Sequence, residues 1–112
     1  MGGGLNYWGP TMNVGRDPRW GRMQESVSEC PWFNGAYAIK YVSGLQGSGD
    51  GVDYVKVASC CKHFYAYSLE NSDGFTRHTF NAIVTPQDLA ETYAILFSFG
   101  YVDHTSFYSD SA

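Results

Sequence analysis

The fold class of this chain is decided by one stretch, YVKVASCC from Tyr54 to Cys61, which is followed at once by Lys62 and His63. The stretch is short, rich in valine and mostly apolar on both faces, as expected for a strand buried inside a parallel sheet. Polar side chains directly after such a strand lie at its carboxyl end, where parallel sheets and barrels bind their ligands. We therefore predict an α/β fold, with Lys62 and His63 in a candidate site.

A helix is predicted before this strand, from Pro31 to about Gln46. Proline suits the first position of a helix, and Ala36, Ile39 and Val42, backed by Ala38 and Leu45, form an apolar stripe at helical spacing. The glycine-rich segment 47–51 comes next and is predicted to be a surface loop. A phosphate-binding loop is the alternative, but no Gly-Lys-Ser/Thr follows the segment.

A second helix is predicted to begin near Pro86. Thr85 has the character of an N-cap, and Asp88 places a negative charge in the first turn. The apolar face of this helix is predicted to contain Leu89, Tyr93 and Leu96. The beginning of the chain, from Leu5 to about Val14, is predicted to be extended. Strands that alternate with helices in this way indicate a parallel α/β arrangement.

Composition and charge narrow the classes of partner. The chain has 112 residues, of which 44% are hydrophobic, so it forms at most one domain and is not disordered. Seven basic and eleven acidic residues give a net charge of -4, which offers no basic field to nucleic acid or to an anionic membrane. No apolar run approaches the ~20 residues that span a bilayer. We therefore expect neither partner, and the first residues lack the apolar region of a signal peptide.

The cysteine pattern predicts free thiols. Cys30, Cys60 and Cys61 are odd in number, and neighbouring residues of a strand point to opposite faces. This pattern does not favour a disulfide framework, and no paired C-x-x-C spacing indicates a metal site. We expect buried free thiols, no metal and no cofactor.

A second polar segment runs from Asp17 to Arg22, with Glu25 behind it. Arg22 keeps its charge at any working pH and offers a planar fork of donors, while Lys62 and His63 add donors at adjacent positions. Such groups can bind several hydroxyls at once. An alternative stays open, in which Arg22 only pairs with Glu25 or Glu29 and the Lys62-His63 pair only ends a strand.

Two further residues near these segments have structural interpretations from chemistry alone. Trp20 is expected to pack in the core or a loop rather than to form a platform on which a ligand stacks. Arg77 lies in a polar stretch beside His78, and its chemistry alone predicts a solvated loop charge.

The order of several motifs resembles the amino-terminal domain of the family-three glycoside hydrolases, and most of all their plant-type β-D-xylosidase branch. The resemblance covers about residues 3 to 97. Its main motifs are Gly4 to Pro10, Arg16 to Arg22 with Gln24-Glu25, Gly44 to Gly47, Cys60 to Phe64 with Ala66-Tyr67, Arg77, Phe80 to Ala82 and Thr85 to Leu89.

The resemblance implies a (β/α)8 barrel and a retaining exo-hydrolase that releases sugars from β-linked oligosaccharides, such as xylo-oligosaccharides. It also implies that Arg22, Lys62, His63 and Arg77 bind the terminal sugar, with Glu25 as a supporting carboxylate. Retaining hydrolysis needs two carboxyl groups about 5–5.5 Å apart. The family takes its nucleophile from a Ser-Asp motif on a later strand and its acid/base from beyond the barrel. We therefore expect no catalytic residue within this chain, because Asp110 comes too soon to be that nucleophile.

The resemblance divides the chain into a partial barrel domain, residues 1–97, with about three of the eight βα units, and a divergent tail, residues 98–112. Cys30 and Ser68 stand where the family usually has aspartate, and Leu96 stands where it has proline. We expect a partial chain that is marginal or prone to aggregate alone, because a partial barrel leaves open strand edges. A non-catalytic carbohydrate-binding or regulatory fragment is the alternative function. The family predicts an extracellular or cell-wall location.

Overall fold

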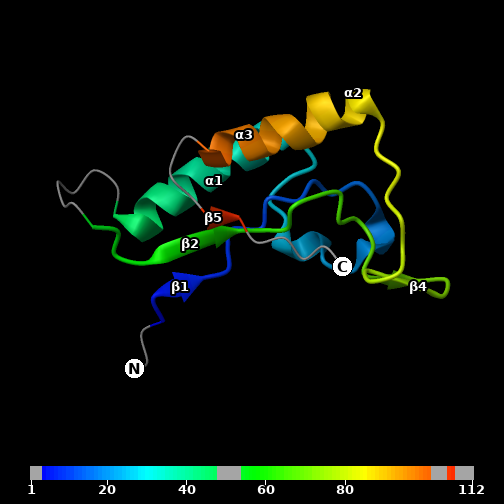
Figure 1. The fold of residues 1–112 in the computed structure, drawn as a ribbon, viewed down its shortest axis with the longest axis horizontal. Coiled ribbons are helices and arrows are strands. Elements are labelled where there is room, and N and C mark those ends of the chain that lie inside the picture. The colour runs from blue at the N-terminus through cyan, green and yellow to red at the C-terminus, as the bar shows by residue number, and fades with distance from the viewer. Residues whose placement is uncertain (1–3, 48–53, 102–105, 108–112) are drawn as a thin grey trace.

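Helices lie against one face of a small parallel sheet in the computed structural model (Figure 1). The structure describes residues 4–47, 54–101 and 106–107. The sheet has the order β1-β2-β5, and both strand pairs are parallel. Its strands are β1 (Asn6–Tyr7), β2 (Ala58–Cys61) and β5 (Ser106–Phe107). The predicted α/β fold class is confirmed.

Helix α1 (Pro31–Gln46) has the predicted bounds, with proline at its first position and Gly47 after its last. Gly47 has φ 76°, a left-handed conformation that glycine adopts without a steric penalty. The predicted apolar stripe is wrong in part, because Ala36 is exposed. The buried residues on this helix are Asn34, Gly35, Ala38, Val42 and Gln46.

Two polar side chains are buried on α1 because each has a backbone partner. The amide of Asn34 donates to the carbonyls of Asn13 and Ser28, at 3.1 and 2.9 Å. The side-chain oxygen of Gln46 accepts from the backbone N–H of Ser59 at 3.2 Å. These hydrogen bonds offset part of the cost of burying the two side chains, although the Asn34 oxygen has no partner within the described part of the chain. The buried face therefore extends beyond the apolar residues.

The second helix begins at Pro86, as predicted. The Thr85 hydroxyl accepts from the N–H of Asp88 at 3.0 Å and caps the first turn. The run continues through α2 (Pro86–Asp88), the π-helical segment η3 (Leu89–Ala94) and α3 (Ile95–Tyr101). Of the predicted apolar face, Tyr93 and Leu96 are buried, whereas Leu89 is 41% exposed.

The prediction that the central strand begins at Tyr54 is wrong, because β2 begins at Ala58. Tyr54 is 84% exposed and Val55 is 59% exposed. The reason is strand pairing. β1 pairs with Ala58 and Ser59, and β5 pairs with the next two residues. Residues 54–57 have no strand partner among the residues that the structure describes. The extended course of 5–14 is confirmed by β1 and by a parallel bridge between Thr11 and Lys62.

The core lies between the sheet and the two long helices. It contains Met12, Val14, Ala38, Val42, Cys61, Leu96 and Phe97. All three cysteines are free, and Cys60 and Cys61 are buried as predicted. The prediction is wrong for Cys30, which is exposed because it precedes the first turn of α1.

Several predictions fall on segments outside the described residues. These include most of the glycine-rich loop 47–51 and, in the tail, Asp110. Helix α3 crosses the predicted boundary at residue 97, and β5 belongs to the tail. Within the described ranges, no helix is both long and apolar enough to cross a membrane.

Candidate functional site

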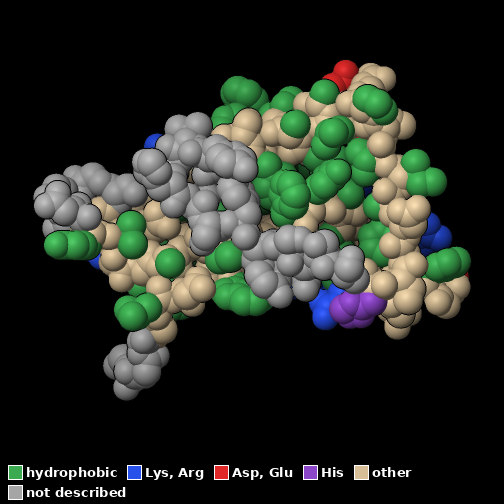
Figure 2. All heavy atoms as spheres, viewed as in Figure 1, with side chains coloured by type: hydrophobic (Ala, Val, Ile, Leu, Met, Phe, Trp, Pro, Cys, Tyr) green, Lys and Arg blue, Asp and Glu red, His purple; other side chains and the backbone are tan. Residues whose placement is uncertain are grey.

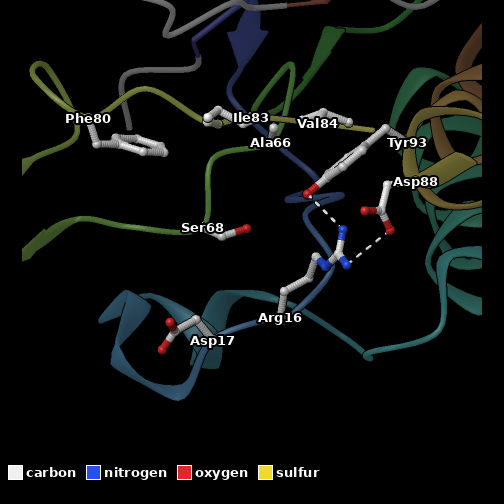
Figure 3. A pocket seen from close by; sticks show the side chains of 10 residues that line it. Arg16, Asp17, Ala66, Ser68, Phe80, Ile83, Val84, Asp88 and Tyr93 are labelled. Carbon is white, nitrogen blue, oxygen red and sulfur yellow. Dashed lines mark hydrogen bonds and ion pairs between the residues drawn. The ribbon is translucent and has the colours of Figure 1, made fainter. Parts of the chain in front are cut away.

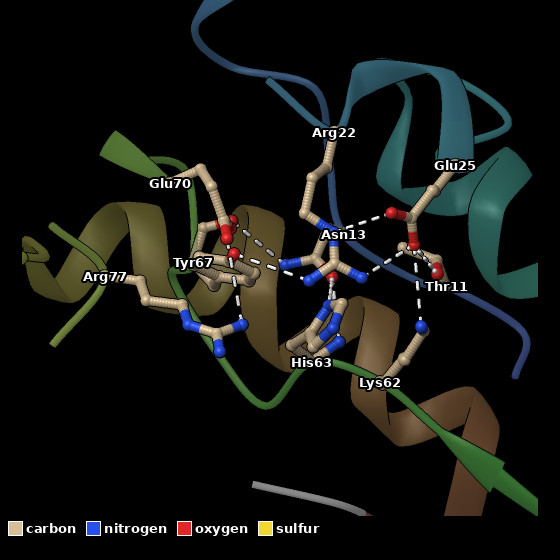
Figure 4. A network of polar contacts seen from close by, with 9 residues as sticks. All are labelled: Thr11, Asn13, Arg22, Glu25, Lys62, His63, Tyr67, Glu70 and Arg77. Carbon is tan, nitrogen blue, oxygen red and sulfur yellow. Dashed lines mark hydrogen bonds and ion pairs between the residues drawn. The ribbon is translucent and has the colours of Figure 1, made fainter. Parts of the chain in front are cut away.

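The Glu25 carboxylate joins two of the predicted donors (Figure 4). Arg22 donates from Nε to Oε1 at 2.6 Å and from Nη2 to Oε2 at 2.8 Å. The Lys62 ammonium lies 3.5 Å from Oε2, and the Thr11 hydroxyl donates to the same oxygen at 3.4 Å. Arg22 therefore pairs with Glu25, and the same carboxylate also contacts Lys62. Arg22 donates to the Tyr67 hydroxyl as well, at 3.4 Å, so the pair with Glu25 is not its only contact.

Short helical turns bring Arg22 and Glu25 to this position. Asp17 caps the turn η1 (Pro18–Trp20) by accepting from the N–H of Arg19 at 2.8 Å. Gly21 follows with φ 87°, a left-handed conformation, so the chain bends directly before Arg22. Glu25 lies on the next turn, η2 (Met23–Glu25).

The buried side chain of Trp20 anchors the loop that carries Arg22 and Glu25. Its side chain is fully buried, with no exposed surface, and its ring contacts the edge of Tyr67 at a centroid distance of 5.5 Å. The expectation that Trp20 packs in the core is confirmed. It holds the loop in place rather than offering an exposed ring to a ligand.

His63 is 3% exposed and is held by two residues that sequence reasoning did not single out. The side-chain oxygen of Asn13 accepts from the backbone N–H of His63 at 2.8 Å and lies 2.9 Å from its Nδ1. Tyr67 contacts the imidazole edge at a centroid distance of 4.9 Å. The guanidinium of Arg22 lies over the same tyrosine ring, at 5.7 Å. Tyr67 therefore connects His63 to the Arg22 side of the site.

Arg77 lies on the opposite side of Tyr67 from Glu25 (Figure 4). It follows a short antiparallel hairpin of β3 (Asn71–Ser72) and β4 (Phe75–Thr76). Its Nη1 is 3.8 Å from Oε1 of Glu70, and its backbone N–H donates to the Glu70 carbonyl at 2.9 Å. The Arg77 side chain keeps 34% of its surface exposed, so it is partly solvated as its chemistry predicts, but it also has an ion-pair partner that the chemistry did not predict.

The sequence gives only weak signals for Asn13 and Tyr67, the two contact residues that it did not single out. Tyr67 lies in the Ala66-Tyr67 pair of a motif, but nothing in its local pattern indicates a contact with Arg22. Asn13 is a polar residue between Met12 and Val14 in an extended segment, which is its only signal.

The two cations lower the pKa of the Glu25 carboxyl to about 2, from a usual value of 4.5. Hydrogen bonds from Arg22 are the main cause, partial burial opposes them, and the charges of Arg22 and Lys62 add to the lowering. Glu25 is therefore ionised at any pH at which an enzyme usually works.

We expect the Glu25 ion pairs to persist as the pH falls to 4.5 and to be lost as it approaches 2. The folded-state pKa lies below the usual value, so the stabilisation is complete above the usual value and decreases as the pH falls through the folded-state value. Titration of the Glu25 carboxyl carbon by NMR measures this. Arg22→Gln should raise the midpoint, and a wild-type midpoint near 4.5 would contradict the prediction.

Arg16 belongs to the same motif as Arg22 but faces a different cavity (Figure 3). It donates to Asp88 at 3.1 Å and to the Tyr93 hydroxyl at 3.4 Å, and these partners raise the pKa of its guanidinium. The cavity measures about 320 Å³, and Ser68 lines it where the resembled family usually has aspartate. Arg16 thus ties the first loop to the second helix.

A second cavity of about 410 Å³ lies beside the second helix and is lined mostly by apolar side chains. Its lining residues are Phe64, Tyr65, Leu89, Tyr93, Ala94, Phe97 and Ser98. Hydrophobic side chains gather on this face of the molecule, below the helical run from α2 to α3 (Figure 2). Within the part of the chain that the structure describes, no cluster of His, Cys, Asp or Glu is suited to a metal ion.

Comparison with known proteins gives the family. The model of the "Glycosyl hydrolase family 3 N terminal domain" matches residues 3–103. The chain belongs to glycosyl hydrolase family 3. This result confirms the resemblance that the motifs indicated.

Relatives within family 3 support this membership. The chain is 52% identical over 91 residues to β-xylosidase/α-L-arabinofuranosidase 1 of Medicago sativa subsp. varia, which covers 80% of this chain and 12% of the relative. It is 53% identical over 94 residues to β-D-xylosidase 1 of Arabidopsis thaliana, covering 84% of this chain and 12% of that protein. The chain therefore spans about 12% of the length of these relatives.

A solved structure supports the α/β fold of this family 3 segment. A mutant β-glucosidase from Listeria innocua, in complex with laminaribiose, aligns with a TM-score of 0.65 and 26% identity. The alignment covers 96% of this chain and 15% of the β-glucosidase.

The family 3 site contains several charged donors close together. Arg22 and Lys62 are held by one carboxylate that cannot take up a proton near neutral pH. Fixed, charged donors of this kind form the stronger hydrogen bonds to uncharged hydroxyls. The geometry suits binding and orientation of a polyhydroxylated ligand.

Proposed function

We propose that this chain supplies the sugar-binding part of a retaining, exo-acting β-glycosidase of the β-D-xylosidase/β-glucosidase type. Arg22, Lys62, His63 and Arg77 bind the terminal sugar of a β-linked oligosaccharide or xylo-oligosaccharide, and Glu25 supports the first two. The observation that carries this proposal is the shared contact of Arg22 and Lys62 with Glu25. The xylosidase names of the Medicago and Arabidopsis relatives agree with it.

We further propose that the described strands and helices are the first part of a (β/α)8 barrel, about three of its eight βα units. Parallel pairing of β1 with β2 and of β2 with β5 supports this architecture. Lys62 follows β2 directly, which is the position at which barrels place their ligand-binding residues. The remaining barrel would then cover the apolar side chains around Phe64 and Phe97.

The low pKa of the Glu25 carboxyl favours a role in sugar binding rather than in proton transfer. A carboxyl group with a pKa of about 2 is a poor general acid at neutral pH. The nucleophile and the acid/base are therefore expected from other parts of the full-length enzyme. An extracellular or cell-wall location stays a prediction from the family.

Titration of the chain with xylose and with glucose tests the proposal. We expect saturable shifts of the Lys62 and His63 amide signals in NMR spectra, and about tenfold weaker binding for Glu25→Gln, which corresponds to about 1.4 kcal/mol. The glutamine amide would direct an N–H group at cations that need an acceptor. Glu29→Gln is the matched control, because it changes an exposed glutamate four residues further on.

Two outcomes separate the function classes. Joined to the rest of a family 3 β-xylosidase, the chain should cleave aryl β-xylosides. Sugar binding without turnover in that assembled enzyme would favour the non-catalytic carbohydrate-binding or regulatory alternative. The absence of any saturable sugar binding would contradict both.

A further inference from the structure

Asn13 lies at the centre of a buried hydrogen-bond network that includes His63 (Figure 4). The residue is 7% exposed. Its side-chain oxygen contacts both the backbone N–H and the Nδ1 of His63, at 2.8 and 2.9 Å. Its side-chain nitrogen donates to the Tyr67 carbonyl at 3.2 Å.

Backbone partners determine which way the Asn13 amide points. The backbone N–H of His63 can only donate, so the Asn13 atom that faces it must be the oxygen. The Tyr67 carbonyl can only accept, so the atom that faces it must be the NH₂ nitrogen. Both ends of the amide are therefore assigned without reference to the histidine ring.

This assignment determines which ring nitrogen of His63 carries the proton. The Asn13 oxygen carries no hydrogen, so Nδ1 of His63 must donate to it. A neutral imidazole has a single N–H, and Nε2 is then left with a lone pair. We infer that Asn13 is a positioning residue that holds neutral His63 in the Nδ1–H tautomer and makes Nε2 a hydrogen-bond acceptor.

Other buried contacts keep Asn13 from turning. Its backbone carbonyl accepts from the Ser26 hydroxyl at 2.5 Å and from the Asn34 amide at 3.1 Å. Asn34, which is 1% exposed, donates to the Ser28 carbonyl as well. The network thus ties the first extended segment to α1, to the loop after η2 and to the segment that carries His63.

The tautomer gives the site a division of roles. Arg22 and Lys62 can only donate hydrogen bonds, whereas Nε2 of neutral His63 accepts one. A hydroxyl can donate and accept at once, so one alcohol group can satisfy both kinds of partner. The idea that Nε2 accepts a hydrogen bond from a sugar hydroxyl rests on the proposed function. The tautomer itself rests only on contacts within the chain.

Long-range ¹H–¹⁵N NMR of the ¹⁵N-labelled 112-residue chain tests the tautomer at a pH where His63 is neutral. The His63 signals are identified by their loss in His63→Gln. We expect a pyrrole-type shift for Nδ1 and a pyridine-type shift for Nε2. The reverse pattern would overturn the inference.

Matched variants separate positioning from general stability. Asn13→Leu removes the acceptor, so the Nε2–H tautomer should appear, whereas Asn13→Asp keeps an acceptor and should retain the proton on Nδ1. Asn34→Leu makes the same change in the same buried network without touching His63, and should leave the tautomer unaltered. An altered tautomer in Asn34→Leu, or an unaltered one in folded Asn13→Leu, would overturn the assignment. If Asn13→Leu does not fold, the wild-type and Asn13→Asp spectra decide.

Addition of xylose distinguishes this inference from the proposed function. A chain that shows the Nδ1–H tautomer but binds no sugar contradicts the proposed function and leaves the inference intact. A chain that binds xylose while its Nε2 carries the proton overturns the inference alone.

Discussion

Lys62→Ala is expected to abolish detectable cleavage of an aryl β-xyloside by the chain when it is joined to the rest of a family 3 β-xylosidase. The Lys62 side chain is only 18% exposed, follows β2 directly and lies 3.5 Å from Glu25. Alanine removes the charged donor that we propose for the sugar, and such a hydrogen bond is worth about 1.5–3 kcal/mol. It also removes a partner of Glu25, the carboxylate that holds Arg22. If the binding groups shift by about 1 Å as a result, the rate can fall by a further 100-fold.

Steady-state kinetics of the assembled enzyme measure this effect as kcat/KM. Lys40→Ala is the matched control, because Lys40 is exposed on the outer side of α1 and the substitution is the same. Circular dichroism of both variants shows whether the fold is retained. Near-normal kcat/KM in Lys62→Ala would refute the role of Lys62 in sugar binding.

Trp20→Ala should have the largest effect on stability. Trp20 has no exposed surface, and truncation of a buried tryptophan costs about 3–5 kcal/mol. Domains are stable by only about 5–15 kcal/mol, and we expect a chain of only 112 residues to lie at the low end of that range. The variant should therefore lose most of its folded population even without denaturant.

Urea unfolding followed by far-UV circular dichroism tests this prediction, with Trp32→Ala as the control. Trp32 is 65% exposed, and its edge-on contact with Phe99 has a centroid distance of 4.9 Å. Its truncation should cost no more than about 1–1.5 kcal/mol. Equal midpoints for the two alanine variants would show that Trp20 does not anchor the loop that carries Arg22.

Local sequence signals predicted the helices better than the central strand. Both helix starts were correct, because proline at the first position and a threonine N-cap act within a few residues of each other. The strand prediction failed for residues 54–57 because a strand needs partners, and β1 and β5 reach only residues 58–61. The buried face of α1 was predicted correctly at Ala38 and Val42. It was missed at Asn34 and Gln46, because the hydrogen-bond partners of these polar side chains lie elsewhere in the chain.

The candidate site shows the same division. Arg22, Glu25, Lys62 and His63 were found from residue types and motif order, and the structure places Arg22 and Lys62 around the Glu25 carboxylate. The ion pair of Arg77 with Glu70 was not predicted, because the polar stretch around Arg77 gives no sign of it.

The sequence by itself determined the α/β class, the family and the choice of candidate donors, because these depend on short motifs and residue chemistry. Only the tertiary structure decided which neutral residues hold those donors. Asn13 and His63 are 50 positions apart, and Arg22 and Tyr67 are 45 apart. Contacts at such separations arise from the packing of whole segments, and no local pattern of residues records them.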